Sequence, residues 1–305
     1  MTGTTENSQP PAGDAPGPTT SEEHRAAGHW LLAKMGKRVL RPGGIELTRR
    51  MLTKLALTQT DRVVELGPGI GRTAELVLSG DYATYTGVEP NAEAREQLTG
   101  ILTGKHDAQC REGDARATGL DEASADAVIS EAMLTMQSAA DKAKIADEVF
   151  RVLKPGGRWA IHELSLRPDD VNQTVVDQIS KALSRTIKVG ARPLTNKDWT
   201  AVLTTAGFEV EWLGNAEMRL IEPSRIIADE GLLGALRFFN NVRRNPAARR
   251  RIMAMRQVFR ANRQNLAAIS MVLRKPATLD SANDRPVAPA EAATQAETIE
   301  SESTA

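Results

Sequence analysis

The feature that most constrains this chain is an alternation of short β-like runs with helical stretches. The β-like runs are mostly apolar and lie at 61–66, 82–89, 107–112, 126–132, 158–164, 208–213 and 266–273. Helical patterns between them cover 71–79, 91–102, 138–153, 170–186 and 195–206. A helix between two strands returns the chain, so that the second strand pairs parallel to the first. We therefore expect an α/β fold with a Rossmann-like, doubly wound sheet of seven strands, mostly parallel.

Two segments lie outside this alternation. Helices over 21–36 and 45–57 are predicted before the first strand, with a Pro-Gly-Gly turn at 41–44 between them. Before the last strand, a helical insertion at 222–265 is predicted to form two helices that break at Asn245-Pro246, because proline cannot continue a helix interior. Such a sheet does not need this insertion, which makes it the candidate cap over a substrate.

The ends of the chain differ from its middle in composition and charge. Residues 1–21 and 277–305 are polar or small, so we expect disordered tails around a domain at 22–276. The chain has 39 Lys+Arg and 39 Asp+Glu, which gives a formal net charge of zero. Residues 1–22 carry three acidic and no basic side chains, and 277–305 carry six acidic and one basic. The body between the tails therefore carries a charge of +8.

Composition also excludes several classes of protein. Cys110 is the single cysteine, so an internal disulfide and a cysteine-rich metal site are both excluded. The first residues lack the basic start and apolar stretch of a secretory signal. No apolar run approaches the roughly 20 residues of a membrane-spanning helix. We expect a cytoplasmic protein with no membrane span and no metal.

A glycine turn follows the first β-like run, in the segment Glu65-Leu66-Gly67-Pro68-Gly69-Ile70-Gly71. Glycines let the chain turn tightly and let a ligand lie against bare backbone, while the next helix offers free N–H groups. Glu89 ends the second run 22 positions after Gly67, where an acidic side chain accepts hydrogen bonds from ribose hydroxyls. The pattern therefore predicts a ligand that contains a nucleoside.

The spacing of the glycines decides between nucleoside ligands. A dinucleotide fingerprint is G-x-G-x-x-G, whereas the third glycine here comes one position early and position 72 is Arg. This spacing disfavours NAD. The chain also contains no G-x-x-x-x-G-K-[ST] phosphate loop, which disfavours an NTPase.

With its later motifs, the chain resembles the class I S-adenosylmethionine (SAM) dependent methyltransferases. The resemblance covers about 60–213 and the closing strand, and within the family it is similar to small-molecule enzymes that include quinone-biosynthesis C-methyltransferases. Five motifs arrive in that family's order after the glycine turn: Glu89, Gly113-Asp114-Ala115, Ala125-Asp126-Ala127-Val128, Val152-Leu153-Lys154-Pro155-Gly156-Gly157 and Ala206-Gly207-Phe208. The glycine turn also looks like that of rRNA adenine dimethylases. Those enzymes carry an Asn-Leu-Pro-Tyr type motif after the fourth strand, where this chain has Ile129-Ser130-Glu131-Ala132-Met133. This difference disfavours N-methylation of a base by their mechanism.

The resemblance implies SAM as cofactor and assigns roles by position. The methionine part would lie against Glu65 and the backbone of Gly67, Gly69 and Gly71. The ribose would bind Glu89, and the adenine would bind Asp114 and Ala115. Ser130 or Glu131, at the end of the fourth strand, would lie near the methyl donor.

Two residues are candidates for a catalytic role. Glu131 would either position the acceptor or cap a loop at the end of its strand. His162 would either serve as general base or be a hydrogen-bonded side chain in a helix layer, because alternation sends His162 and Glu163 to opposite faces. The residues alone leave both alternatives open.

A basic run gives the main alternative function. Residues 237–263 contain nine arginines and no acidic residue, which indicates either a solvated helix face or an anionic partner such as RNA. Aromatic residues make up only 4% of the chain and no nucleic-acid-binding module is present, so a small-molecule acceptor, largely apolar or anionic, is favoured over RNA. A SAM-binding regulatory protein without turnover is an alternative of another class, because the motifs indicate donor binding and not transfer.

Overall fold

A computed structural model describes residues 27–277 of the chain. These residues form an eight-stranded sheet of order β3-β2-β1-β4-β5-β8-β7, with β6 paired to β5 off this path. β8 runs antiparallel to β5 and to β7, and the other strand pairs are parallel. The expected doubly wound, mostly parallel sheet is confirmed. The expected tail at 1–21 lies outside the described residues, as does the tail at 277–305 apart from residue 277.

The strands follow the expected order along the chain, and the two-residue β6 is an addition to the seven expected. Their bounds are β1 Arg62–Leu66, β2 Thr84–Val88, β3 Ala108–Arg111, β4 Ala125–Glu131, β5 Leu153–Leu166, β6 Leu194–Thr195, β7 Glu209–Glu217 and β8 Leu266–Arg274. β5 begins earlier than expected because the Lys-Pro-Gly-Gly turn is itself part of the strand. β1, β4 and β5 are central in the sheet and mostly buried, because helices cover both of its faces.

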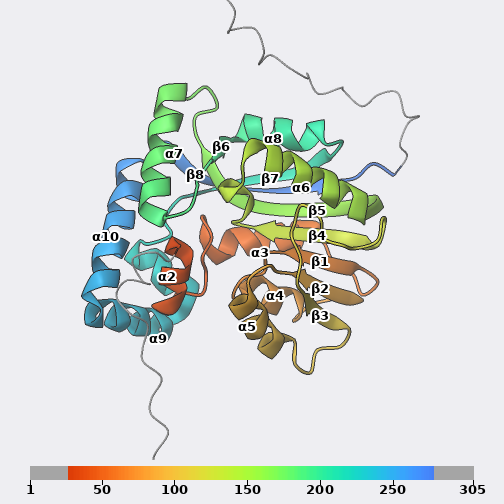
Figure 1. Ribbon diagram of the computed structural model, residues 1–305, viewed down its shortest axis with the longest axis horizontal. Helices are drawn as coiled ribbons and strands as arrows, with labels where there is room; N and C mark the ends of the chain where they lie inside the picture. The colour runs from red at the N-terminus through yellow and green to blue at the C-terminus, as the bar shows by residue number, and fades with distance from the viewer. Residues whose placement is uncertain (1–26, 278–305) are drawn as a thin grey trace, which may run out of the picture.

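The helices connect the strands and add a layer at one end of the molecule. Their bounds are α2 Gly28–Lys34, α3 Gly44–Leu55, α4 Arg72–Val77, α5 Ala92–Leu102, the 3-10 helix η1 Leu134–Met136, α6 Ala139–Val152, α7 Gln173–Ile187, α8 Asn196–Thr205, α9 Pro223–Arg244 and α10 Pro246–Ala261. The first expected helix, at 21–36, is described only from residue 27, and there α2 covers its middle. Figure 1 shows α7, α9 and α10 together at the end of the molecule away from β3.

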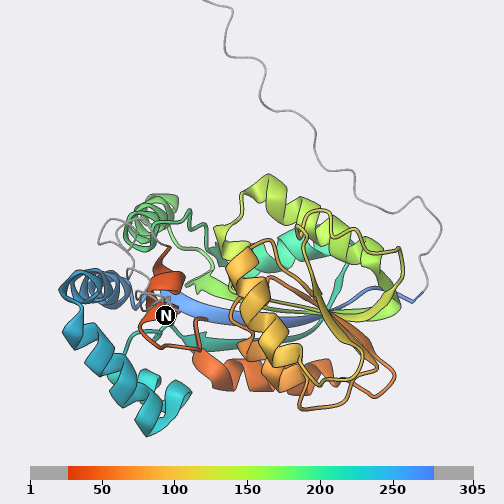
Figure 2. The same cartoon turned by 60° about the horizontal axis from the view of Figure 1, so that its bottom comes forward.

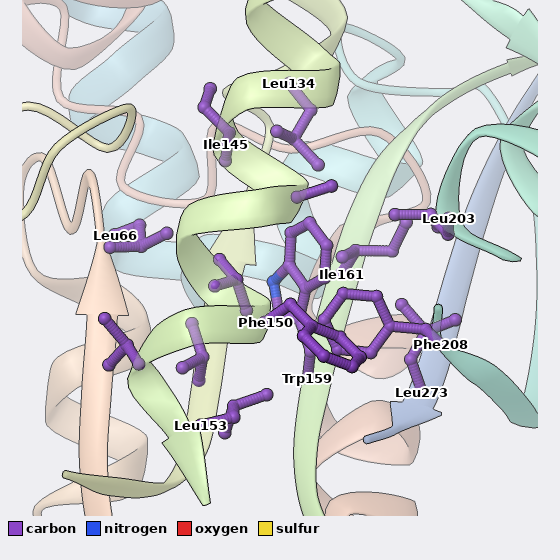
Figure 3. Close-up of a cluster of buried hydrophobic side chains, with 14 of the residues drawn as sticks. Leu66, Leu134, Ile145, Phe150, Leu153, Trp159, Ile161, Leu203, Phe208 and Leu273 are labelled. Carbon is purple, nitrogen blue, oxygen red and sulfur yellow. The ribbon is translucent and has the colours of Figure 1, made fainter. Parts of the chain in front are cut away.

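Three apolar clusters hold these layers together. One cluster packs α3, α4 and α5 on one face of the sheet, and a second packs α6 and α8 on the other. The second is drawn in Figure 3, where the Trp159 ring on β5 meets Phe208 at 5.3 Å between ring centres. Phe150 on α6 contacts the same Phe208 ring edge-on at 5.2 Å. Aromatic rings bury large apolar areas, so this cluster fixes the sheet against α6.

The third cluster joins the N-terminal helix to the insertion. It contains buried side chains of α2, α7, α9 and α10, including Leu31, Phe238 and Ile252. The break at Asn245-Pro246 occurs as expected, between α9 and α10. α9 has a second kink at Gly231, whose φ of 71° and ψ of 173° are not helical. Figure 2 shows the insertion beside the body of the sheet rather than within it.

Candidate functional site

A cavity of about 390 Å³ lies at the carboxyl ends of β1, β2 and β4. Open α/β sheets bind ligands at this edge, where the strand order reverses around the first strand. The wall is formed by three segments that follow these strands, at 65–70, 88–91 and 131–133, and by residues from α2 and the turn before α3. The sheet topology therefore brings the glycine turn, Glu89 and the end of the fourth strand together.

The glycine turn has the backbone that its sequence predicts. Gly67 and Gly69 line the cavity with φ of 63° and 55°, values that side chains disfavour. The Gly67 N–H donates to the Val88 carbonyl at 2.9 Å, which ties the turn to β2. Gly71 lies outside the cavity wall, and a Cβ there would come within 2.4 Å of the Ile101 side chain. Its role in the structure is the close packing of α4 against α5.

Glu89 is a buried carboxylate at the end of β2, in the cavity wall. It accepts the Gly69 N–H at 3.0 Å on one oxygen and the Asn91 N–H at 2.9 Å on the other. These bonds fix the carboxylate and the glycine turn relative to each other. Each carboxylate oxygen has a further lone pair, so Glu89 keeps acceptor capacity for hydroxyl groups in the cavity.

Glu65 presents a second buried carboxylate to the cavity. Among residues 27–277, its side chain accepts a hydrogen bond from the Tyr85 hydroxyl at 2.7 Å. Burial raises the pKa of Glu65 to about 8, and the Tyr85 bond lowers it only in part. A cationic group in the cavity would stabilise the ionised form, because the low dielectric strengthens the attraction.

The segment after β3 also reaches the cavity, through Asp114 and Ala115. Asp114 accepts a forked pair of hydrogen bonds from Arg116, from Nε at 2.9 Å and from Nη2 at 2.6 Å. This fork lowers the pKa of Asp114, so its carboxylate is ionised. Ala115 packs against the apolar cluster under α6.

Glu131 lies in the cavity wall at the centre of a buried polar network. Arg41 and Thr73 both donate to one of its oxygens, and Thr48 donates to the other at 2.7 Å. Burial would raise the pKa of Glu131, but Arg41, His162 and Thr73 together bring it down to about 2. A carboxylate held at so low a pKa is a weak base, so the network favours a positioning role for Glu131 over proton transfer.

His162 is fully buried behind Glu131 and does not line the cavity. Its Nδ1 faces the Glu131 carboxylate at 2.9 Å, and its Nε2 faces the Pro42 carbonyl. Both ring nitrogens therefore contact acceptors, and neither is directed to a substrate. Glu163 points to the opposite face, where it accepts the N–H groups of Met133, Leu134 and Thr135.

Ser130 is the one expected cofactor contact on β4 whose side chain is turned away from the cavity. It is fully buried, and its hydroxyl accepts from the Trp159 indole at 3.1 Å. The structure thus brings Glu65, Gly67, Gly69, Glu89, Asp114, Ala115 and Glu131 to the cavity wall. Gly71, Ser130 and His162 support that wall from behind.

Sequence reasoning placed neither His29 nor Arg38 in the wall, and for Trp30 and Arg41 it favoured helix packing and a plain turn over a contact at the cofactor site. His29 and Trp30 of α2 and Arg38 and Arg41 before α3 line the cavity, although they precede the first strand by more than twenty residues. Burial lowers the pKa of His29, which is therefore neutral at neutral pH. The aromatic pair on α2 and the Arg-Pro-Gly-Gly turn were the only sequence signals for this part of the wall. Within residues 27–277 no group of three or more His, Cys, Asp or Glu is placed to hold a metal ion.

Comparison with known proteins identifies the family. A family model described as a methyltransferase domain matches residues 64–161. A protein of Haemophilus influenzae, described as uncharacterized, is 32% identical over 218 residues, which cover 70% of this chain and 84% of the relative. The chain belongs to the class I SAM-dependent methyltransferases. The matched segment runs from β1 to β5 and contains the glycine turn and four of the five later motifs, whereas Ala206-Gly207-Phe208 lies beyond it.

Solved structures share the fold of this methyltransferase at low identity. The [4+2]-cyclase SpnF superposes with a TM-score of 0.62 at 17% identity, covering 83% of this chain and 97% of that chain. A phosphoethanolamine N-methyltransferase from Haemonchus contortus, solved with phosphomonomethylethanolamine and S-adenosylhomocysteine, gives a TM-score of 0.60 at 16% identity. That match covers 82% of this chain and 57% of the other. One fold thus carries different reactions, so the acceptor has to be inferred from the site.

SAM is the cofactor of this methyltransferase family, and the cavity fits it. Glu65 is a buried carboxylate that makes no ion pair among residues 27–277, and its raised pKa leaves it able to gain from a cation, which suits the ammonium group of the methionine part. Glu89 has acceptor capacity left for hydroxyl groups, and a Cβ at Gly69 would meet only the Gly67 carbonyl, at 4.0 Å. The bare backbone and the two carboxylates therefore match a ligand with hydroxyl groups and positive charge.

Proposed function

We propose that this methyltransferase transfers a methyl group from SAM to a small, largely apolar acceptor that carries an anionic group. The supporting observation is the part of the cavity wall that the cofactor motifs do not supply. It contains apolar side chains from four segments: Trp30, Leu40, Met133, Met136 and Ile145. These surfaces favour an acceptor with apolar rings or chains, since ligand pockets are mainly apolar with a few placed polar groups.

The charges at the same end of the cavity favour an anionic group on the acceptor. Arg38 and Arg72 line the wall and share one carboxylate, that of Glu75. Arg41 lines the wall beside them, held by Glu131 and Thr73. An acceptor carboxylate or phenolate would contact these guanidinium groups, which bind planar anions through paired hydrogen bonds.

The cofactor contacts proposed from the resemblance use the residues that reach the cavity. Glu65 with the Gly67 and Gly69 backbone holds the methionine part, Glu89 the ribose, and Asp114 with Ala115 the adenine. Gly71 acts indirectly, because it allows α4 to lie close to α5. Ser130 and His162 act as supports of the wall and not as direct contacts.

The chemistry that SAM supplies is a methyl group activated on a sulfonium centre. The protein then has to align the acceptor with that methyl group and exclude water. Trp30 and the methionines after β4 supply an apolar wall for this purpose. The Glu131 network fixes Arg41 in that wall, so Glu131 and His162 are positioning residues in this proposal.

A proton acceptor is needed where the acceptor's hydroxyl or amine must lose a proton. His29 is the histidine of the cavity wall, and burial lowers its pKa, which keeps it in the neutral, proton-accepting form. We assign the general-base role to His29 rather than to His162, because both nitrogens of His162 already contact acceptors.

The experiment that tests this proposal is methyl transfer from labelled SAM into a fractionated metabolite extract, followed by mass spectrometry of the labelled product. The expected product is a small apolar molecule with an acidic group, and quinol-type rings belong in the panel of pure acceptors because of the sequence resemblance. The Glu89→Ala variant is the control, since loss of a ribose contact should abolish labelling. Labelling confined to RNA would overturn the proposal, as would SAM binding without any S-adenosylhomocysteine release.

A further inference from the structure

The part of α9 after its kink carries apolar side chains on its exposed surface. Leu232, Leu233 and Leu236 are 70%, 81% and 65% exposed, and Phe239 of the same helix is 38% exposed. Leu232, Leu236 and Phe239 follow each other at intervals of four and three residues, so they form one stripe along the helix. Monomeric proteins rarely expose large aliphatic side chains side by side without a partner.

This stripe is not the face by which α9 packs on the protein. Ala235 and Phe238 point inward and are buried in the cluster with α2 and α10. The helix is therefore apolar on two sides, and only one side has a partner among residues 27–277. None of the helices in this range is long and apolar enough to cross a bilayer.

Arginines lie on one flank of the exposed stripe. Arg237 and Arg244 follow Leu233 by four and eleven residues, which places all three side chains on the same side of the helix. Arg249 and Arg250 lie near the start of α10, which begins at Pro246, and Met253 is exposed one helical turn further on. These four arginines are exposed and have no ion-pair partner in the part of the chain that the structure describes. Residues 231–279 contain no Asp or Glu, so α10 and the part of α9 after its kink carry only basic charges. The exposed apolar residues of α9 and these four arginines are here called the α9–α10 face.

We propose that the α9–α10 face (Leu232, Leu233, Leu236, Phe239, Arg237, Arg244, Arg249 and Arg250) docks on the surface of an anionic phospholipid bilayer. The leucines would enter the boundary between headgroups and acyl chains, while the guanidinium groups contact lipid phosphates. Interfacial helices bind in this way, with buried apolar area and cation–phosphate attraction acting together. The α9–α10 face would therefore recognise a lipid phosphate group that lies next to hydrocarbon.

Charge argues against the other occupants of this face. A second copy of the chain would place the same arginines opposite each other, with no acidic residue to separate them. RNA would contact the arginines through its phosphates, but it would leave the exposed leucines unburied. Proteins that bind single strands also stack the bases on exposed aromatic side chains. The bilayer surface is the partner that satisfies both halves of the face.

The test is flotation of the full chain with vesicles of phosphatidylcholine, either pure or with about 30 mol% phosphatidylglycerol. Binding is expected only to the anionic vesicles, and about 0.5 M NaCl should release most of the protein because salt screens the arginines. The variant Leu233→Gln/Leu236→Gln should bind at least about tenfold more weakly. The variant Arg237→Gln/Arg244→Gln should bind the anionic vesicles about fivefold more weakly for each arginine removed.

Two matched controls separate the face from general effects. Lys54→Gln/Arg62→Gln removes the same charge at exposed positions of α3 and β1 and should bind as the parent does. Val210→Gln removes an exposed apolar side chain of β7 and should also leave binding unchanged. Circular dichroism and SAM binding of every variant verify that the fold is retained.

Three results would overturn the inference. One is binding that does not distinguish anionic from neutral vesicles, and another is equal binding by the leucine variant. The third is a dimer or an RNA complex that needs this face while vesicles do not bind. The face is separate from the donor cavity, so methyl transfer to a dissolved acceptor would survive each of these results, and the proposed function is tested independently.

Discussion

At the scale of single residues, the site depends on where each carboxylate finds its partners. Glu65, Glu89 and Glu131 all lie in one cavity wall, yet their surroundings differ. Glu131 has a guanidinium and two hydroxyl donors, whereas Glu65 has one hydroxyl. The pKa of Glu131 is about 2 and that of Glu65 is about 8 as a result. Glu131 is thus ionised at neutral pH, whereas the charge of Glu65 responds to pH and to ligands.

Glu65→Gln should stabilise the ligand-free protein at alkaline pH. The pKa of Glu65 rises from 4.5 unfolded to about 8 folded, so its ionisation destabilises the fold increasingly as pH rises from 4.5 to 8. At pH 9 the variant should gain stability on the order of 4 kcal/mol, and at pH 4 almost none. Urea unfolding at both pH values measures the difference, with exposed Glu96→Gln on α5 as control. A gain that does not change with pH would contradict the assignment.

The same raised pKa predicts proton release when SAM binds. A cationic ammonium beside Glu65 favours the carboxylate, so binding should strengthen from pH 6 to pH 8 and release protons near neutrality. Calorimetry in two buffers of different ionisation enthalpy counts the released protons. Glu65→Gln should bind SAM weakly and release none.

His29→Gln should change the pH dependence of turnover. Burial lowers the pKa of His29, so at saturating SAM the parent's kcat/KM for the acceptor should rise with pH through a value below 6.5 and then level off. The variant's kcat/KM should be about 100-fold lower at neutral pH and should not show this rise with pH. His106→Gln, at an exposed position, is the matched control and should behave as the parent does. An unchanged profile in His29→Gln would exclude His29 as the base.

At the scale of elements, the contact between α4 and α5 holds the glycine turn in place. Gly71 caps α4 with a φ of 76°, and α5 packs directly against it. Gly71→Ala should destabilise the protein by about 2 to 4 kcal/mol, because it adds backbone strain and a clash with Ile101. Gly100→Ala lies on α5 with nothing within 4 Å and should be neutral or slightly stabilising. Thermal unfolding of both variants measures this contrast, and equal melting temperatures would contradict the packing role.

A second element-scale feature ties the insertion to the cavity wall. Lys37 is fully buried and donates to Asp229 at 3.0 Å, and the N–H groups of Arg38 and Val39 donate to Glu230. Asp229 and Glu230 end the first part of α9, directly before the Gly231 kink. The insertion therefore holds the segment that carries Arg38 and Arg41 into the cavity.

At the scale of the whole molecule, residues 27–277 contain the wall residues to which we assign the cofactor contacts, Glu65, Gly67, Gly69, Glu89, Asp114 and Ala115. A chain limited to residues 27–277 should therefore bind SAM within about twofold of the full chain, since none of these residues is removed. Calorimetric titration of both proteins checks this. A loss of tenfold or more would show that an end segment contributes to the site.

The sheet was predictable because its signals are local. Apolar strands, helical periods and glycine turns each act over a few residues, and the motif order then defines the topology. Spacing predicted that Gly67, Gly69 and Glu89 lie near one another, and the resemblance added Glu65. All four line the cavity, because their strands end at a common sheet edge, and their contacts with the cofactor stay a prediction. The start of β5 and the kink at Gly231 were missed, since pairing and packing decide them.

By itself the sequence determined the fold class, the family and the edge of the sheet at which the cavity lies. Only the tertiary structure decided that His162 and Ser130 face inward, that Glu131 is bound by Arg41, and that α2 brings His29 and Trp30 to the cavity. Those outcomes depend on partners 29 to 120 positions away in the chain, which no local pattern encodes. Burial and hydrogen bonding between distant segments set the orientation and protonation of each group, and so they divide the residues that line the cavity from those that support its wall.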